Sequence, residues 1–211
     1  MPESRSFLFS ISENISNEYL ENARASGIKF IGYFCSYVPE ELLGVKGLSA
    51  FRMRAKNTTT TEVADAYLGA FNCTYTRCLL EAILNNEYGF LDGFVFAASC
   101  DHLRRLYDNI QYAVSPNFCH ILDLPHKSHK NAIDWYAGEL SMLRDALASY
   151  FGLNITDTDL AEAVRQSNEN RRLLAAINEL RKLNRPPITG EEMQRLMVAS
   201  FSLPKAKVMK S

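Results

Sequence analysis

Residues 91–108 read LDGFVFAASCDHLRRLYD, and this stretch joins two patterns that together predict the fold. Residues 91–99 are mostly apolar without alternation, which is typical of a strand buried on both faces. After Cys100, apolar residues recur at the spacing of an amphipathic helix. A buried strand that leads directly into a helix is the repeating unit of a parallel sheet covered by helices.

The segments on either side repeat this alternation of strands and helices. Further strands, rich in β-branched and aromatic residues, are predicted at residues 28–35, 48–55 and 118–124. Helices are predicted at residues 16–25 after a polar leader, at 40–45 behind Pro39, and at 62–86 with a break near Cys73. Residues 1–127 therefore predict an α/β fold, a Rossmann-like parallel-sheet sandwich with right-handed crossovers.

Beyond Pro125 the pattern changes to helices alone. One helix is predicted to end near Gly152, and capping boxes that begin at Thr156 and Thr189 open two more. The helix that follows Thr156 is expected to bury one stripe, made of Leu160, Val164, Leu174 and Ile177. Residues 128–203 are thus a helical segment, and residues 204–211 are expected to be a frayed basic tail.

The composition is that of an ordinary soluble globular chain, with 211 residues, 47% hydrophobic and 22% charged content. The net charge of −1 gives no reason to expect a nucleic acid or an acidic membrane as partner. No stretch approaches the length of a membrane span, and the first residues lack the apolar core of a signal peptide. The odd number of cysteines, five at irregular spacing, argues for a reducing compartment, so we expect a cytoplasmic protein with free thiols.

Two of the cysteines, Cys73 and Cys100, are each expected where the chain turns into a helix, and we call them the helix-start cysteines. Unpaired N–H groups at a helix start favour the thiolate, the form that binds metal. Cys35 and Cys100 also end their strands, at the edge of a parallel sheet where ligands gather. Cys119 instead begins its strand, about 17 Å away along about five residues. Cys78 lies about 140° around the helix from Cys73, so we expect Cys78 and Cys119 to be packed inside.

Spacing alone leaves two interpretations of the helix-start cysteines open. They lie 27 residues apart and neither belongs to a C-x-x-C pair, which makes a weak metal signal. The alternative is that both are buried structural cysteines, which are common.

Longer segments resemble the 2-hydroxyacyl-CoA dehydratase and benzoyl-CoA reductase family. The similar segments in the first half are GYFCSYVPEELL (32–43), NCTYTR (72–77), DGFVF (92–96) and SCDHLRR (99–105). The later ones are LDLP (122–125), the 136–143 helix with Glu139 and Leu140, NENRR (168–172) and PITGE (187–191). Each segment is loose by itself, but their order and spacing from about Gly27 to Met197 are specific.

The resemblance implies an oxygen-sensitive enzyme of anaerobic metabolism, made of two homologous subunits. Each subunit in this family holds a [4Fe–4S] cluster through three cysteines, and Cys73 and Cys100 match the first two. A separate ATP-hydrolysing activator protein delivers single low-potential electrons, which serve to dehydrate or reduce an acyl-CoA. Cysteine thiolates are the usual ligands of such clusters.

The chain departs from the family pattern at the third cysteine. In this family that ligand comes much later, in a second α/β domain that is not among these 211 residues. The resemblance therefore implies the N-terminal half of a subunit, whose helical segment leads to the absent domain. Cys35 is an alternative third sulfur at the same sheet edge, although the family does not use that position.

Other polar residues near the sheet edge are further candidates. Ser36 and Tyr37 are the catalytic candidates, placed to hydrogen-bond a substrate carbonyl or the cluster, and the alternative is a turn with a solvated tyrosine. Glu40 and Glu41 are adjacent and should face apart on a helix, which argues against a paired acid and base. Asp101 is expected to cap the helix of Cys100. Three histidines are either secondary contacts of the site or exposed loop residues: His102, His126 and His129.

Three classes of function remain from the sequence. The favoured one is an iron–sulfur catalytic subunit that acts on an acyl-CoA. The second is a non-catalytic electron-transfer or partner subunit of the same fold without a cluster. The third, a nucleotide-binding α/β domain, is disfavoured because no strand leads into G-x-G-x-x-G or a P-loop.

Overall fold

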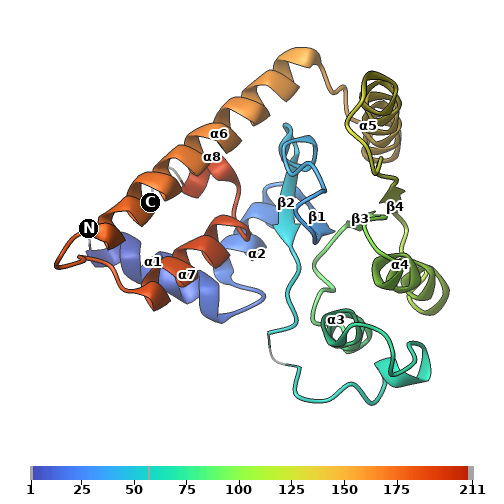
Figure 1. The fold of residues 1–211 in the computed structure, drawn as a ribbon, viewed down its shortest axis with the longest axis horizontal. Helices are drawn as coiled ribbons and strands as arrows, with labels where there is room; N and C mark the ends of the chain where they lie inside the picture. The colour runs from blue at the N-terminus through green and yellow to red at the C-terminus, as the bar shows by residue number, and fades with distance from the viewer. Residues whose placement is uncertain (1, 57, 209–211) are drawn as a thin grey trace. The chain divides into compact units, whose positions relative to one another are not determined.

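The computed structural model describes residues 2–56 and 58–208, and Figure 1 shows the course of the chain. The strands are β1 (Lys29–Tyr33), β2 (Leu48–Arg52), β3 (Gly93–Ala97) and β4 (Cys119–Leu122). The α-helices are α1 (Pro2–Glu13), α2 (Glu18–Ala25), α3 (Thr74–Leu84), α4 (Asp101–Ala113), α5 (Lys130–Phe151), α6 (Asp157–Glu179), α7 (Gly190–Ser200) and α8 (Lys205–Val208). The short 3-10 helices are η1 (Leu42–Gly44), η2 (Ala64–Ala66) and η3 (Leu180–Lys182).

The four strands form one sheet in the order β2-β1-β3-β4. β3 runs parallel to both of its neighbours, with Tyr33 of β1 opposite Val95 and Leu122 of β4 opposite Ala97. All residues of β3 are buried, which explains why its sequence does not alternate. α4 packs against β3 and β4 and α5 packs against β4, on opposite sides in Figure 1. The predicted α/β class, a parallel sheet followed by a helical segment, is confirmed.

The chain divides into two compact units, each built from separate stretches. The helical unit contains the described residues of Met1–Lys29, Glu40–Phe51 and Thr156–Ser211. The sheet unit contains Phe30–Pro39 and Arg52–Ile155. Both candidate cysteines therefore lie in the sheet unit.

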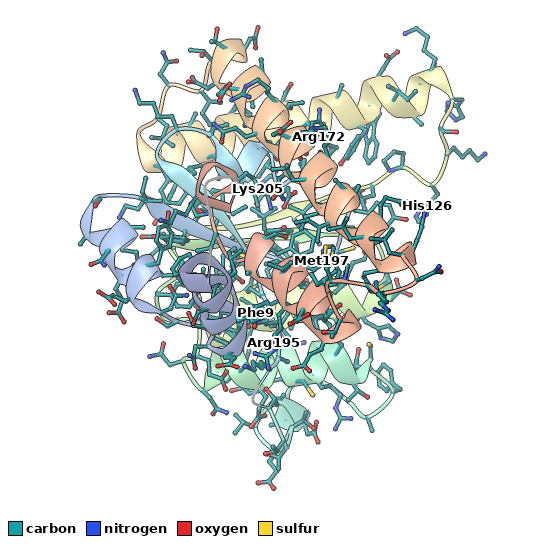
Figure 2. The ribbon with its side chains drawn as sticks, turned by 90° about the vertical axis from the view of Figure 1, so that its left-hand side faces the viewer. Phe9, His126, Arg172, Arg195, Met197 and Lys205 are labelled. Carbon is teal, nitrogen blue, oxygen red and sulfur yellow. The ribbon has the colours of Figure 1, made fainter. Side chains whose placement is uncertain are left out.

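In the helical unit, the first residues form α1, where the sequence predicts only a polar leader. α1 packs against α7, and its Leu8 and Ile11 share a small core with Ala199 and Leu203 from the other end of the chain. Figure 2 shows the outer side of this contact, where the guanidinium of Arg195 lies 5.8 Å from the ring centre of Phe9. α1 thus depends on partners that its own sequence does not reveal.

The predicted helix boundaries after Pro125 agree with the structure. Thr156 and Thr189 each accept a hydrogen bond from the third residue of the helix, with the reciprocal bond also present. Gly152 ends α5 in the left-handed conformation, with φ of 64°.

The buried stripe of α6 differs from the expected one. Its buried residues are Ala163, Ser167 and Asn170, whereas Val164 is 44% exposed. α6 contacts η1, α7 and α8. Small residues allow such neighbours to approach closely, so here the size of the side chains and not their hydrophobicity selects the inner face.

Three shorter segments also differ from their predictions. Residues 40–45 contain only the single 3-10 turn η1, and residues 62–73 contain only η2 before α3 begins at Thr74. Residues 205–208 form α8 where a frayed tail is expected, and residues 209–211 of that tail lie outside the described residues. Among the helices that the structure describes, each is too short or too polar to traverse a bilayer.

Candidate functional site

Cys73 is the N-cap residue of α3. Its carbonyl accepts a hydrogen bond from the Thr76 hydroxyl at 2.7 Å, while its side chain makes no capping hydrogen bond. The side chain is exposed. Its sulfur therefore stands at a helix start, accessible to a ligand, as the sequence predicts.

Cys100 has the same local role at the start of α4. It follows β3 in extended conformation, its sulfur makes no capping hydrogen bond, and it is exposed. Asp101 is expected to cap this helix, but Cys100 occupies the cap position and Asp101 is the first helical residue. There its carboxylate interacts favourably with the positive end of the helix dipole.

His102 joins these two helix starts. The backbone N–H of Cys73 donates to Nδ1 of His102 at 3.4 Å, and the same nitrogen lies 3.4 Å from Oδ1 of Asn72. The unprotonated Nδ1 accepts from Cys73, and the other tautomer donates to Asn72. α3 also packs against α4. The structure thus brings the starts of the two helices together through a residue two positions after Cys100.

A cavity of about 680 Å³ opens beside His102. It is lined by Phe71, Asn72, Asp101, His102, Arg104, Arg105, Tyr107, Asp108 and Ile121. Its charges are mixed, and Arg105 pairs with Asp108 at 3.7 Å. In the first turn of α3, burial raises the pKa of Tyr75, and the Tyr75 hydroxyl donates to the Met53 carbonyl at 3.0 Å.

The remaining cysteines lie in different surroundings. Cys119 is half-buried, whereas the sequence predicts that it is packed inside, and this partial burial raises the pKa of its thiol to about 12. Cys78 is half-buried. Cys35 has a φ of 78°, which is uncommon for a residue with a side chain, and its sulfur lies 3.4 Å from the hydroxyl of Ser99.

Two exposed thiols at helix starts fit an iron–sulfur cluster in the chemistry of their donor atoms. The described residues contain no group of three His, Cys, Asp or Glu side chains arranged to hold a metal ion.

Ser36 and Tyr37 lie in the loop after β1. The Ser36 hydroxyl accepts a hydrogen bond from the Arg52 guanidinium at 3.4 Å. Tyr37 is 64% exposed, and its carbonyl accepts from the hydroxyl of Tyr136 at 3.4 Å. Arg52 and Tyr136 are contacts that the sequence analysis missed, because no local pattern links them to this loop.

The histidines separate into three roles. His102 contacts Cys73, as described above. His126 lines a second cavity together with Tyr37 and Tyr136. The side chain of His129 caps α5 by accepting from the Ala132 N–H at 3.3 Å, which makes it a structural residue.

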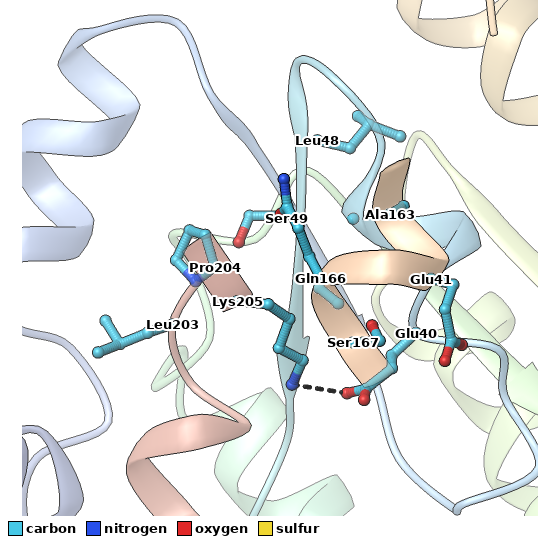
Figure 3. Close-up of a pocket in the computed structure, with 12 residues that line it drawn as sticks. Glu40, Glu41, Leu48, Ser49, Ala163, Gln166, Ser167, Leu203, Pro204 and Lys205 are labelled. Atoms are coloured by element: carbon cyan, nitrogen blue, oxygen red, sulfur yellow. Dashed lines mark ion pairs between the residues drawn. The ribbon is translucent and has the colours of Figure 1, made fainter. Parts of the chain in front are cut away.

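Glu40 and Glu41 belong to the helical unit, and they converge where the sequence predicts divergence. Both carboxylates pair with Arg171. Glu40 also pairs with Lys205 at 2.9 Å (Figure 3). The reasoning from helical spacing fails because both residues precede the single turn η1. Lys205 and Glu40 line a small cavity of about 40 Å³ with Ser49 and Ser167.

Comparison with known proteins gives consistent matches over most of the chain. A family model described as 2-hydroxyglutaryl-CoA dehydratase, D-component, matches residues 35–211. The chain is 26% identical over 179 residues to a benzoyl-CoA reductase subunit of Thauera aromatica, covering 83% of this chain and 46% of that protein. It is 25% identical over 196 residues to the (R)-phenyllactyl-CoA dehydratase beta subunit of Clostridium sporogenes, covering 92% and 52%.

A third relative, the (R)-2-hydroxyglutaryl-CoA dehydratase beta subunit of Acidaminococcus fermentans, is 28% identical over 166 residues, covering 78% of this chain and 43% of that protein. The chain thus spans about half the length of the curated relatives that it matches.

Proposed function

The chain belongs to the 2-hydroxyglutaryl-CoA dehydratase D-component family, and on that premise we propose that it is a subunit, or the N-terminal part of one, of an iron–sulfur-dependent enzyme. That enzyme uses single low-potential electrons to dehydrate or reduce an acyl-CoA. Its partners are a homologous second subunit and an ATP-dependent activator protein that donates the electrons.

One observation carries this proposal. The helix-start cysteines are both exposed, both cap a helix without using their sulfur, and their helices meet through the contact of Cys73 with His102. Helix starts present unpaired N–H groups, which favour the negative charge of a thiolate and of a cluster with its sulfides.

Each residue has a distinct part in the proposal. Cys73 and Cys100 hold a [4Fe–4S] cluster, and a domain or subunit beyond the described residues supplies the third sulfur. When bound, the cluster supplies single low-potential electrons and an iron with an open position. His102 fixes the backbone of Cys73, because its ring accepts the Cys73 N–H. Ser36 and Tyr37 orient the substrate carbonyl by hydrogen bonding.

The test is the iron content of the anaerobically purified protein, isolated together with the polypeptides that accompany it in the cell. We expect a brown protein, and we expect Cys73→Ser and Cys100→Ser each to abolish bound iron. Cys78→Ser is the matched control, because it makes the same change five residues further along the chain, at a half-buried position on α3. Full iron content in both helix-start variants would refute the proposal.

The second candidate is a partner or electron-transfer subunit without its own cluster. It is favoured by the lack of three clustered metal ligands among the described residues. The two candidates differ in where iron resides. If the helix-start variants keep full acyl-CoA turnover in a complex whose iron belongs to another chain, the second candidate is correct.

A further inference from the structure

A second cavity in the sheet unit, of about 380 Å³, lies where three neighbouring parallel strands end. We call it the tyrosine cavity, and its lining consists of Tyr37, Ser99, Leu124, Pro125, His126 and Tyr136. Tyr37 follows β1, Ser99 follows β3, and the segment 124–126 follows β4. This edge is where ligands of parallel α/β sheets bind. Ser99 directly precedes Cys100, so the cavity adjoins one helix-start cysteine along the chain.

Hydrogen bonds between distant segments hold the walls of the tyrosine cavity. The Tyr136 hydroxyl, from α5, donates to the carbonyl of Tyr37, 99 positions away. Ser99 contacts the sulfur of Cys35 at 3.4 Å. Burial raises the pKa of Tyr136, so its hydroxyl stays protonated at neutral pH and remains a donor. Two phenol rings, a leucine and a proline thereby present apolar surface beside the polar side chains of Ser99 and His126.

The lining carries no fixed charge. Among the described residues that surround the tyrosine cavity, none is lysine, arginine, aspartate or glutamate. Next to it, Asp123 accepts from the Leu124 N–H at 3.0 Å, and Glu139 lies 3.4 Å from the Asp123 N–H. Arg104 already pairs with Asp123 at 3.4 Å. The lining thus offers a ligand carboxylate no lysine or arginine, and two carboxylates lie beside Leu124, which disfavours the binding of an anion.

Resting on the proposed function, we infer that the tyrosine cavity binds the acyl group of the substrate and that this group is uncharged and aromatic. The volume of the tyrosine cavity suits a group the size of a phenyl ring with a short chain. Aromatic walls prefer another ring in stacked or edge-on contact, whereas a small aliphatic group would leave much of the volume unfilled. A dicarboxylic acyl group is selected against because its second carboxylate would be partly desolvated with no lysine or arginine in the lining.

The experiment measures binding of three CoA thioesters to the full chain by isothermal titration calorimetry. Their acyl groups are 3-phenyllactyl, lactyl and 2-hydroxyglutaryl, so the shared CoA contributes equally and the acyl groups alone differ. Since binding is the readout, the measurement needs no cluster and no turnover. We expect the phenyllactyl thioester to bind at least about tenfold more tightly than either of the others.

Two variants locate the preference. Leu124→Arg places a cation in the lining and should reverse the order of affinity, so that the 2-hydroxyglutaryl thioester binds more tightly than the phenyllactyl thioester. Tyr136→Ala removes one aromatic wall and should abolish the phenyllactyl preference. Tyr112→Ala is the matched control, because Tyr112 is 81% exposed on α4 and does not line the cavity. It should leave all three affinities unchanged.

The outcomes separate this inference from the proposed function. Equal affinities for the three thioesters, or tightest binding of the 2-hydroxyglutaryl thioester, would refute the aromatic acyl group and leave an acyl-CoA enzyme in place. Failure of every thioester to bind more tightly than free CoA would refute the acyl-CoA assignment itself. If Leu124→Arg does not fold, the order of the three affinities in the wild type and its change in Tyr136→Ala still test the preference for an aromatic acyl group.

Discussion

Lys205→Met should destabilise the helical unit by about 2–3 kcal/mol. The Lys205 ammonium donates to the Glu40 carboxylate at 2.9 Å and to the Ser200 carbonyl at 2.8 Å, and it lies 5.1 Å from the ring centre of Phe201. Both partners of the ion pair are only 11% exposed. Burial lowers the pKa of Lys205 and the nearby Glu40 carboxylate opposes that shift, so the pair offsets a real desolvation cost.

The magnitude follows from what the substitution leaves behind. Removing one partner of a buried ion pair costs about 3–5 kcal/mol, because the other charge loses its counter-ion. Here Arg171 still lies 3.7 Å from Glu40, and methionine keeps the apolar contacts of the lysine stem. These two features reduce the expected loss of stability in Lys205→Met to about 2–3 kcal/mol.

The assay is urea unfolding followed by circular dichroism, with Lys182→Met as the matched control. Lys182 pairs with Glu179 at 2.7 Å, but these side chains are 70% and 62% exposed. The same substitution there should cost less than about 0.5 kcal/mol. Adding Glu40→Gln to Lys205→Met should recover about 1 kcal/mol, since no buried carboxylate then lacks its lysine. Equal losses at Lys205 and Lys182 would contradict this account of α8.

Three further predictions concern the sheet unit. Iodoacetamide followed by mass spectrometry should label the helix-start cysteines well before Cys119, because both are exposed and burial holds the Cys119 thiol protonated; prior labelling of Cys119 would contradict its place in the structure. The pKa of Cys119 is about 12 in the folded protein, against 9.0 for a solvated thiol. The protonated thiol therefore stabilises the folded state fully below pH about 9, and this stabilisation is lost as pH rises towards 12. Well above pH 9 the loss approaches about 1.4 kcal/mol per pH unit, and between pH 8.5 and 9.5 it is about half of that. Urea titrations at these two pH values should show a smaller fall in the free energy of unfolding for Cys119→Ala than for the wild type, whereas an equal fall would assign the loss to other groups. Gly93→Ala should cost about 2–3 kcal/mol, since its new Cβ would lie 2.9 Å from the Cβ of Phe118 and 3.0 Å from its carbonyl oxygen, whereas Gly44→Ala, with nothing within 4 Å, should change stability by less than about 0.5 kcal/mol in the same assay.

Local chemistry made the sheet and the helix boundaries predictable. A strand buried on both faces needs apolar residues throughout, as in β3, and a capping box needs only side chains three positions apart, as at Thr156. The position of Cys100 follows for the same reason, since the end of β3 and the start of α4 adjoin it in sequence.

Features that depend on distant partners were not predictable in this way. α1 is held by α7, and α6 buries Ser167 and Asn170 in place of the larger Val164. Periodicity can show that a helix has two faces, but the neighbour that covers one face decides how large its residues can be.

By itself the sequence determined a parallel α/β fold, a helical segment after it and two cysteines at helix starts, because strands, caps and turns are set by residues a few positions apart. Only the tertiary structure decided that His102 meets Cys73, 29 positions away, and that Tyr136 meets Tyr37, 99 positions away. Such contacts form when strands and helices pack, and the side chains that then meet across an edge of the sheet carry no signal in their local sequence.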